Sequence, residues 1–150
     1  MRKFLKILAI CMAIIVGVFF FYFNNTSLVS AKSKSFYMLL KDSLRNQGFD
    51  DNLLVVSTKR FKWHNNLQVK FAGAASKSRH LKGDALDFLV FDINEDGISN
   101  GKDVDIVYAI LDKKIIKDQG GIGTYKMESG FWNRQMIHID SRGKYARWKR

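Results

Sequence analysis

The chain has 150 residues, a length that fits one domain, and it carries 25 Lys and Arg against 14 Asp and Glu, for a net charge of +11. Its single cysteine, Cys11, lies in an apolar run near the N-terminus. The rest of the chain therefore cannot form a disulfide, and a cysteine enzyme or a zinc finger built on thiolates is excluded there.

Residues 1–31 have the layout of an export signal. Arg2, Lys3 and Lys6 precede an apolar run at residues 7–23, and small residues follow in "LVSA" at residues 28–31. An uncleaved membrane anchor is the alternative, because the run is at the short edge of a membrane span. Both interpretations place residues 32–150, the predicted domain, outside the cytoplasm: secreted, periplasmic or anchored at the cell wall.

Residues 32–150 show the periodicity of alternating helices and strands. Apolar residues at helical spacing predict a helix that stops at Gly48, and "NLLVVST" at residues 52–58 predicts a buried strand. The pattern then predicts a helix from residue 62 to near Gly73 and a strand at residues 85–93.

The second half continues with a helix at residues 103–114, an extended segment at 120–127 and a strand at 135–140. Helices and strands mix without a regular βαβ order, which predicts an α+β fold. Residues 32–150 carry 22 basic and 14 acidic side chains, and this net charge of +8 favours anionic partners such as wall polymers, lipid headgroups or nucleic acid.

Two segments carry residues typical of a metal site. His80 and Asp87 are seven residues apart, about 10.5 Å along a continuous helix, so they converge only if the chain turns at Gly83 and Asp87 belongs to a strand. In the strand "MIHID", His138 and Asp140 share the face opposite the apolar residues. Two imidazoles and one carboxylate leave a fourth zinc position open for water, the pattern of catalytic zinc.

These motifs resemble the zinc D-alanyl-D-alanine carboxypeptidase family, whose fold is shared by hedgehog signalling domains. "SRHLKGDALD" is similar to its Ser-x-His-x-x-Gly-x-Ala-x-Asp motif, and "GGIGTY…FWNRQMIHIDSRGKYARW" is similar to its closing segment. The resemblance implies an antiparallel sheet with flanking helices, zinc bound by His80, Asp87 and His138, and peptidoglycan stem peptides as substrate. It also implies that Arg60 holds the substrate or polarises its scissile carbonyl.

The residue that would act as general base is not evident. Several branches of that family place a glutamate three residues before the last zinc histidine, where this chain has Gln135. Asp140 is the nearest alternative, either as the base or as a residue that orients a ligand histidine, and Glu128 is its rival. His64, the third histidine, is expected to be a solvated helix residue.

A second ion is predicted at residues 92–103, "DINEDGISNGKD". Oxygen-bearing side chains alternate around Gly97, which occupies the sixth position of a calcium loop. The predicted ligands are Asp92, Asn94, Asp96, Ile98 through its carbonyl, and Asp103. The segment resembles the loop–helix half of a dockerin repeat, and an Asx-rich surface turn is the alternative.

The sequence therefore predicts a zinc metallopeptidase that acts on peptidoglycan peptides, with zinc and calcium as cofactors. The alternative is a non-catalytic, calcium-dependent cell-wall-binding module on the same fold, which Gln135 favours. A nucleic-acid binder is disfavoured, although "RGKYARWKR" interleaves basic and aromatic residues, because of the export signal and the acidic loop. Anionic wall polymers, and the membrane through residues 1–31, are the further partners expected.

Overall fold

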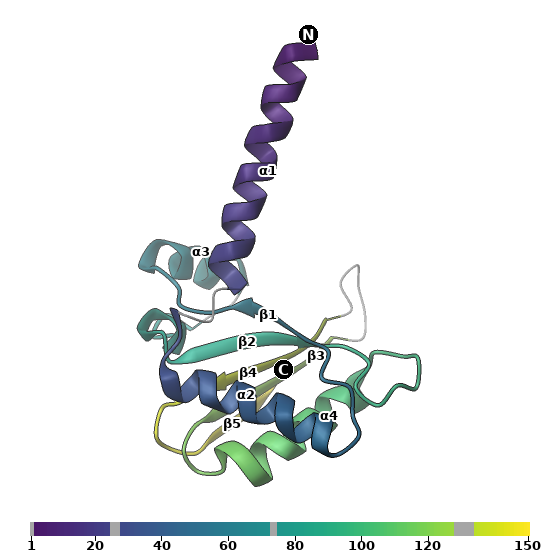
Figure 1. Cartoon of the computed structure of the whole chain (residues 1–150). Helices are drawn as coiled ribbons and strands as arrows, with labels where there is room; N and C mark the ends of the chain where they lie inside the picture. The colour runs from purple at the N-terminus through teal and green to yellow at the C-terminus, as the bar shows by residue number, and fades with distance from the viewer. Residues whose placement is uncertain (1, 25–27, 73–74, 128–133) are drawn as a thin grey trace.

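The structure is a computed structural model that describes residues 2–24, 28–72, 75–127 and 134–150 (Figure 1). The helices are α1 (Arg2–Asn24), α2 (Ala31–Asn46), α3 (Lys62–Ala72) and α4 (Gly101–Ile110), with a 3-10 turn, η2 (Arg79–Lys82), and a π-helical segment, η3 (Leu111–Ile116). The strands are β1 (Leu53–Ser57), β2 (Ala85–Val90), β3 (Gly121–Met127), β4 (Arg134–Asp140) and β5 (Ala146–Lys149).

The five strands form one sheet in the order β1-β2-β4-β3-β5. The pairs β1/β2, β2/β4 and β3/β4 are antiparallel, and β5 runs parallel to β3 at the edge. The predicted α+β class and mainly antiparallel sheet are therefore confirmed, while β5 was not predicted from the sequence.

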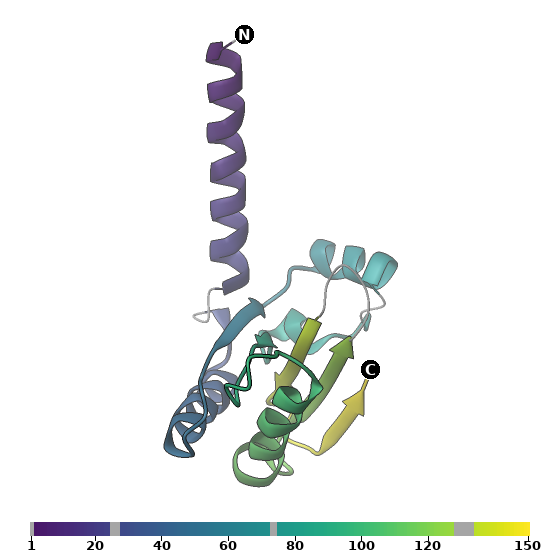
Figure 2. The ribbon, with the colours of Figure 1, turned by 90° about the vertical axis from the view of Figure 1, so that its right-hand side faces the viewer.

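Alternation along the central strands separates an apolar face from a polar one. Leu86 and Phe88 on β2 pair with Ile139 and Ile137 on β4, and all four are fully buried. This face packs against α2 and α4, which lie along the same side of the sheet (Figures 1 and 2). The residues between them in β2 and β4 belong to the other face, where α3 lies.

The domain begins slightly before the boundary predicted at residue 31. Val29 is buried in the core, and the Ser30 side chain caps α2 by accepting a hydrogen bond from the Ser33 amide. The Ser30 amide also donates to the Gly83 carbonyl over 2.8 Å. Cleavage after Ala31 would remove this cap, whose loss costs about 1 kcal/mol.

The N-terminal helix α1 extends away from the domain (Figure 1). Its described apolar side chains are exposed, for example Phe4 and Ile15. None of the described helices is both long enough and apolar enough to cross a membrane.

Candidate metal centre

His80 reaches the polar face of the sheet through η2 and the turn that follows. Ser78 caps this turn by accepting a hydrogen bond from the His80 amide, and Gly83 ends it in the left-handed conformation at φ 73°. Because residues other than glycine disfavour this conformation, Gly83 lets the chain reverse into β2. His80 and Asp87 thus lie on separate elements, η2 and β2, which is the condition for their convergence.

Asp87 and His138 are brought together by the register of the sheet. They are directly opposite one another in the antiparallel β2/β4 pair. Side chains at such positions lie on the same face with their Cβ atoms about 5 Å apart. The strand prediction for "MIHID" therefore places the second histidine correctly.

The three predicted zinc ligands meet in one cluster. The Asp87 Oδ1 atom lies 2.7 Å from His138 Nδ1 and 3.1 Å from His80 Nε2, and these two nitrogens are 3.2 Å apart. All three residues are buried. Among the described residues they are the one group of His, Cys, Asp and Glu whose ligand atoms converge within 4.8 Å.

Hydrogen bonds behind the cluster fix which nitrogen each histidine presents to it. His80 Nδ1 lies 2.5 Å from the Thr58 carbonyl oxygen, to which it donates, so Nε2 directs its lone pair into the cluster. His138 Nε2 lies 3.2 Å from Asp140 Oδ2, so Nδ1 is the atom that faces Asp87. This support of ligand histidines by a carbonyl and a carboxylate is typical of metal centres. The donor set of two imidazoles and one carboxylate fits zinc.

Asp140 is fully buried and strongly hydrogen-bonded. Arg142 donates Nε to Oδ1 over 2.7 Å and Nη2 to Oδ2 over 2.5 Å, and the Gly121 amide donates to Oδ1. A Cβ at Gly121 would overlap the carboxylate of Asp140, so glycine is required there. Of the two roles that the sequence leaves open for Asp140, this geometry favours the positioning of His138 over proton transfer.

The charges of the cluster are coupled. Burial opposes the ionised form of Asp87, but the adjacent imidazoles of His80 and His138 hold its pKa well below its usual value. Burial lowers the pKa of His80, whereas the carboxylates of Asp87 and Asp140 outweigh burial at His138 and raise its pKa. Hydrogen bonds from His138 and Arg142 likewise outweigh burial at Asp140 and lower its pKa. Asp87 in the cluster and Asp140 behind it are therefore both ionised.

Arg60 lies beside the cluster. Its Nη2 donates to Asp87 Oδ2 over 2.6 Å, and its Nε donates to Ser57 Oγ over 2.9 Å. The predicted contact with substrate stays a prediction. The contact with Asp87 shows that Arg60 also fixes the carboxylate whose other oxygen faces the histidines.

The cluster opens into a cavity of about 720 Å³. Trp148 forms one wall, with its ring 5.2 Å from that of His138 and its Nε1 donating to the Tyr125 hydroxyl over 3.2 Å. A Cβ at Gly123 would overlap this indole, so the glycine of "GGIG" opposite His138 makes room for Trp148. The cationic side chains that line the cavity are Arg60, Lys77, Arg79, Arg142 and Arg150.

His64 belongs to this cavity, which contradicts its expected solvated position. It lies on α3 and is 8% exposed, because the polar side of α3 faces the cavity rather than solvent. Burial lowers the pKa of its imidazole, and the nearby charge of Arg60 acts in the same direction. The sequence carries no clear signal for this placement, since the apolar residues of α3 give no indication that its polar side is buried.

Gln135 lies on the other side of the sheet. It is three residues before His138 in β4, and residues an odd number apart in a strand face opposite ways. Gln135 lines a separate cavity of about 510 Å³ beside α4. A carboxylate at this position would therefore not reach the cluster, and its replacement by glutamine removes no base from it. Glu128 lies outside the described residues.

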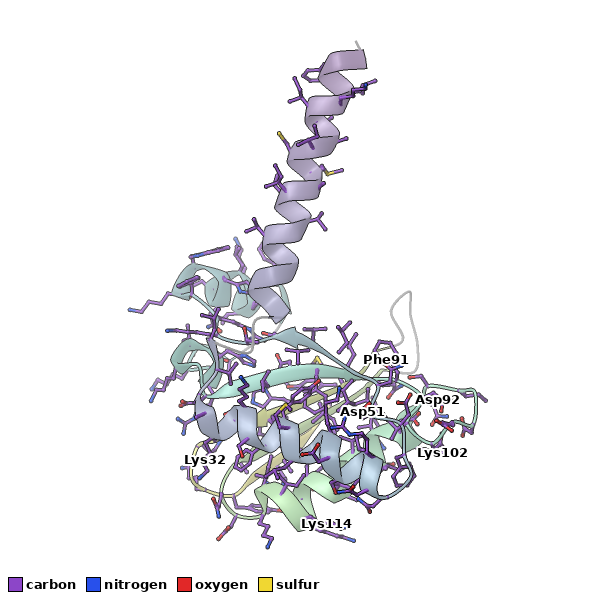
Figure 3. All side chains as sticks on the ribbon, in the orientation of Figure 1. Lys32, Asp51, Phe91, Asp92, Lys102 and Lys114 are labelled. Carbon is purple, nitrogen blue, oxygen red and sulfur yellow. The ribbon has the colours of Figure 1, made fainter. Side chains whose placement is uncertain are left out.

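The segment at residues 92–103 forms a compact loop, and Asp92 lies at the end of the domain away from α3 (Figures 1 and 3). Asp92 Oδ2 accepts from the Gly97 amide over 2.7 Å, and Asp96 Oδ1 accepts from the Ile98 amide over 3.0 Å. Gly97 has φ 85°, as the predicted sharp turn requires. The loop geometry accords with the sequence pattern, and calcium binding stays a prediction.

Asp103 has a structural role that the sequence did not reveal. It is fully buried and accepts from the Ile93 amide through Oδ1 and from the Asn100 amide through Oδ2, each over 2.8 Å. Together with the Asn100 side chain it forms the capping box of α4. The carboxylate closes the loop onto the helix through these hydrogen bonds.

Comparison of the chain with protein-family models, with curated proteins and with solved structures found no match. These comparisons therefore assign the chain to no family, and the resemblance to the zinc carboxypeptidases rests on the sequence motifs alone.

Proposed function

We propose that this protein is a zinc metallopeptidase that hydrolyses peptide bonds in peptidoglycan stem peptides outside the cytoplasm. The observation that supports the proposal best is the convergence of His80 Nε2, Asp87 Oδ1 and His138 Nδ1 at the wall of a large cavity. Burying two imidazoles and a carboxylate is costly without a compensating partner, and a bound cation is such a partner.

Zinc held by these three residues would polarise a scissile carbonyl and lower the pKa of a water molecule to about 7. The chain's own residues keep the ligands in place. Thr58 and Asp140 fix the two imidazoles, Arg142 neutralises Asp140, and Arg60 holds the outer oxygen of Asp87. Such support determines ligand orientation and commonly changes metal affinity 10- to 100-fold.

The cavity favours an anionic substrate. Its lining has five Lys and Arg side chains, and among its described lining residues Asp87 is the one carboxylate. Peptides with several carboxylates, such as wall stem peptides, would be attracted by this charge. The indole of Trp148 offers an apolar surface next to His138 for the rest of the chain of such a peptide.

The shortage of carboxylates also favours the second candidate, a binding module without activity. Asp87 is committed to the two histidines and to Arg60, and Asp140 to His138 and Arg142. Peptide hydrolysis requires a group that takes up a proton and delivers it to the leaving amine. His64, which lines the cavity, and Glu128 are the residues to test for that role.

The experiment is the incubation of the zinc-loaded full chain with purified peptidoglycan, followed by mass spectrometry of the soluble products. We expect fragments with new peptide termini that are lost on chelation and in a His138→Ala variant. Sedimentation with intact peptidoglycan, without release of fragments by the wild type, would instead support the binding module.

A further inference from the structure

Helix α3 has its apolar side turned away from the domain. Trp63, Leu67 and Phe71 recur every four residues, so they lie along one side of the helix, and they are 65%, 48% and 75% exposed. The polar residues His64 and Asn65, by contrast, are buried. A helix that packs on a globular domain normally shows the reverse arrangement, with its apolar stripe facing the core.

The exposed stripe is larger than an isolated apolar side chain. Phe61, just before the helix, is also 53% exposed. Large contiguous apolar surfaces are rare on soluble monomers and mark sites that bind a protein or a membrane. The stripe therefore requires an occupant, which its charge and position identify.

The surroundings of the stripe are cationic. Residues 61–72, which span the stripe, contain two lysines and no Asp or Glu. Lys62 and Lys70 lie on α3 itself, and the Lys70 ammonium is 5.3 Å from the centre of the Phe71 ring. An apolar stripe with a tryptophan and flanking lysines is the composition of helices that lie in the interface of an anionic bilayer.

The position of α3 in the fold agrees with this composition. In both Figure 1 and Figure 2, α3 lies at the end of the domain from which α1 extends, and it runs across the direction of α1. The described apolar side chains of α1 are exposed as well. The exposed apolar side chains of α1 and of α3 thus lie at the same end of the molecule, as expected if that end contacts a lipid bilayer.

We propose that α3 binds the interface of an anionic lipid bilayer through Trp63, Leu67 and Phe71, with Lys62 and Lys70 at the headgroups. A second copy of the chain fits less well, because a symmetric contact through α3 would bring the lysines of both copies together. An anionic surface would instead attract the lysines of a single copy.

Docking of α3 would also place the cavity close to the membrane. His64 and Gln68 line the cavity from the side of α3 that packs on the domain. The helix would then separate the bilayer from the candidate metal centre by its own thickness, about 10 Å. Substrates that lie near the membrane would therefore have the shortest path to the cavity.

The test must report on α3 itself, because α1 can hold the full chain on vesicles whatever α3 does. The full chain is reconstituted into vesicles of phosphatidylcholine with phosphatidylglycerol, in which the acyl chains carry bromine as a fluorescence quencher. The wild type is compared with Trp63→Phe, which removes one indole and keeps an aromatic side chain. Trp148→Phe, which removes the indole in the cavity wall, is the matched control.

We expect bromine to quench part of the wild-type emission, and we expect this part to be lost in Trp63→Phe and kept in Trp148→Phe. It should shrink in vesicles of phosphatidylcholine alone and in Lys62→Gln/Lys70→Gln, but not in Lys113→Gln/Lys114→Gln. Lys114 lies at the end of the domain far from α1 (Figure 3).

If bromine quenches the same fraction of the emission in the wild type and in Trp63→Phe, the proposal is wrong. Equal quenching in neutral and anionic vesicles would also overturn it, since the charge argument would then be wrong. Crosslinking of two chains through α3 in the vesicles, with Trp63 protected from bromine, would assign the stripe to a second copy instead.

Discussion

The two predicted ion sites are built in different ways. The His80, Asp87 and His138 cluster joins three segments through the register of the sheet, and its ligand atoms face one another. The loop at residues 92–103 is local, and the carboxylates of Asp92 and Asp96 accept hydrogen bonds from amides of the same loop.

This difference shows which site is better arranged to hold an ion. Asp92 is half-buried and Asp96 is exposed, and both accept hydrogen bonds within the loop, so the turn itself accounts for them. The cluster is buried, and its nitrogen lone pairs point at one another across a shared carboxylate oxygen. Only a cation, or a proton, satisfies that arrangement. If both sites bind an ion, its removal should therefore affect the cluster more than the loop.

The largest effect is expected at the ligand histidines. His80→Ala and His138→Ala should each abolish stoichiometric zinc, because two remaining ligands cannot complete the coordination of a zinc centre. Elemental analysis of the purified full chain measures this, with circular dichroism to establish that the domain is folded. His64→Ala, which changes a histidine of the same cavity outside the cluster, should retain one zinc. Full retention in both ligand variants would refute the site.

A smaller effect is expected at Asp140. If it positions His138, Asp140→Asn should weaken zinc affinity about 10- to 100-fold, since the carboxylate that supports the imidazole is lost. If it is the general base, turnover should fall about 100-fold or more with zinc still bound. Chelator competition and turnover at saturating zinc separate the two roles, and the hydrogen bonds from Arg142 lead us to expect the first.

Glu128→Gln and His64→Gln complete this test. The variant that abolishes turnover while zinc stays bound identifies the residue that transfers the proton in place of Asp140. If Asp140→Asn alone abolishes turnover at full zinc occupancy, the positioning role is wrong.

Replacing a glycine near the cluster or in the loop should lower the free energy of unfolding by about 1–3 kcal/mol. Gly123→Ala should destabilise the domain because the new methyl group overlaps Trp148, and a second change, Trp148→Ala, should recover part of the loss. In Gly97→Ala the new methyl group would have no atom within 4 Å. The variant should therefore lose about 1–2 kcal/mol of stability from the positive φ alone. Urea unfolding measures both, and equal effects of Gly123→Ala with and without Trp148 would contradict the packing argument.

Much of the candidate cluster could be predicted from the sequence. Histidines are rare in the chain, and the turn at Gly83 and the alternation in "MIHID" are local signals. The same alternation also shows that Gln135 and His138 face opposite ways, so the sequence alone could have removed Gln135 from the search for a base.

Other features depend on contacts between distant residues. The support of His80 by the Thr58 carbonyl joins residues 22 positions apart. The four-residue strand β5 is too short to carry a period, and it is defined by its parallel pairing with β3. The orientation of α3 could not be predicted, because burial of its polar side reverses the usual rule.

The smallest effect is expected from calcium. An ion that binds only the folded state stabilises it by mass action, and extracellular loops of this kind have dissociation constants of about 10⁻⁴–10⁻³ M. Several millimolar calcium should then raise the free energy of unfolding by about 1–2 kcal/mol. Asp92→Asn with Asp96→Asn tests this when each protein is compared with itself in chelator, because asparagine keeps one of the two acceptor oxygens of each carboxylate and loses the charge. Asp103→Asn is a poor probe, since that carboxylate also caps α4 and its loss would destabilise the domain without calcium.

Thermal melting of the chelated full chain, with and without calcium, measures the shift, and magnesium serves as the control ion. A melting temperature indifferent to calcium in the wild type would leave the loop as a turn held by its own hydrogen bonds, and the contrast with the buried cluster would then be complete.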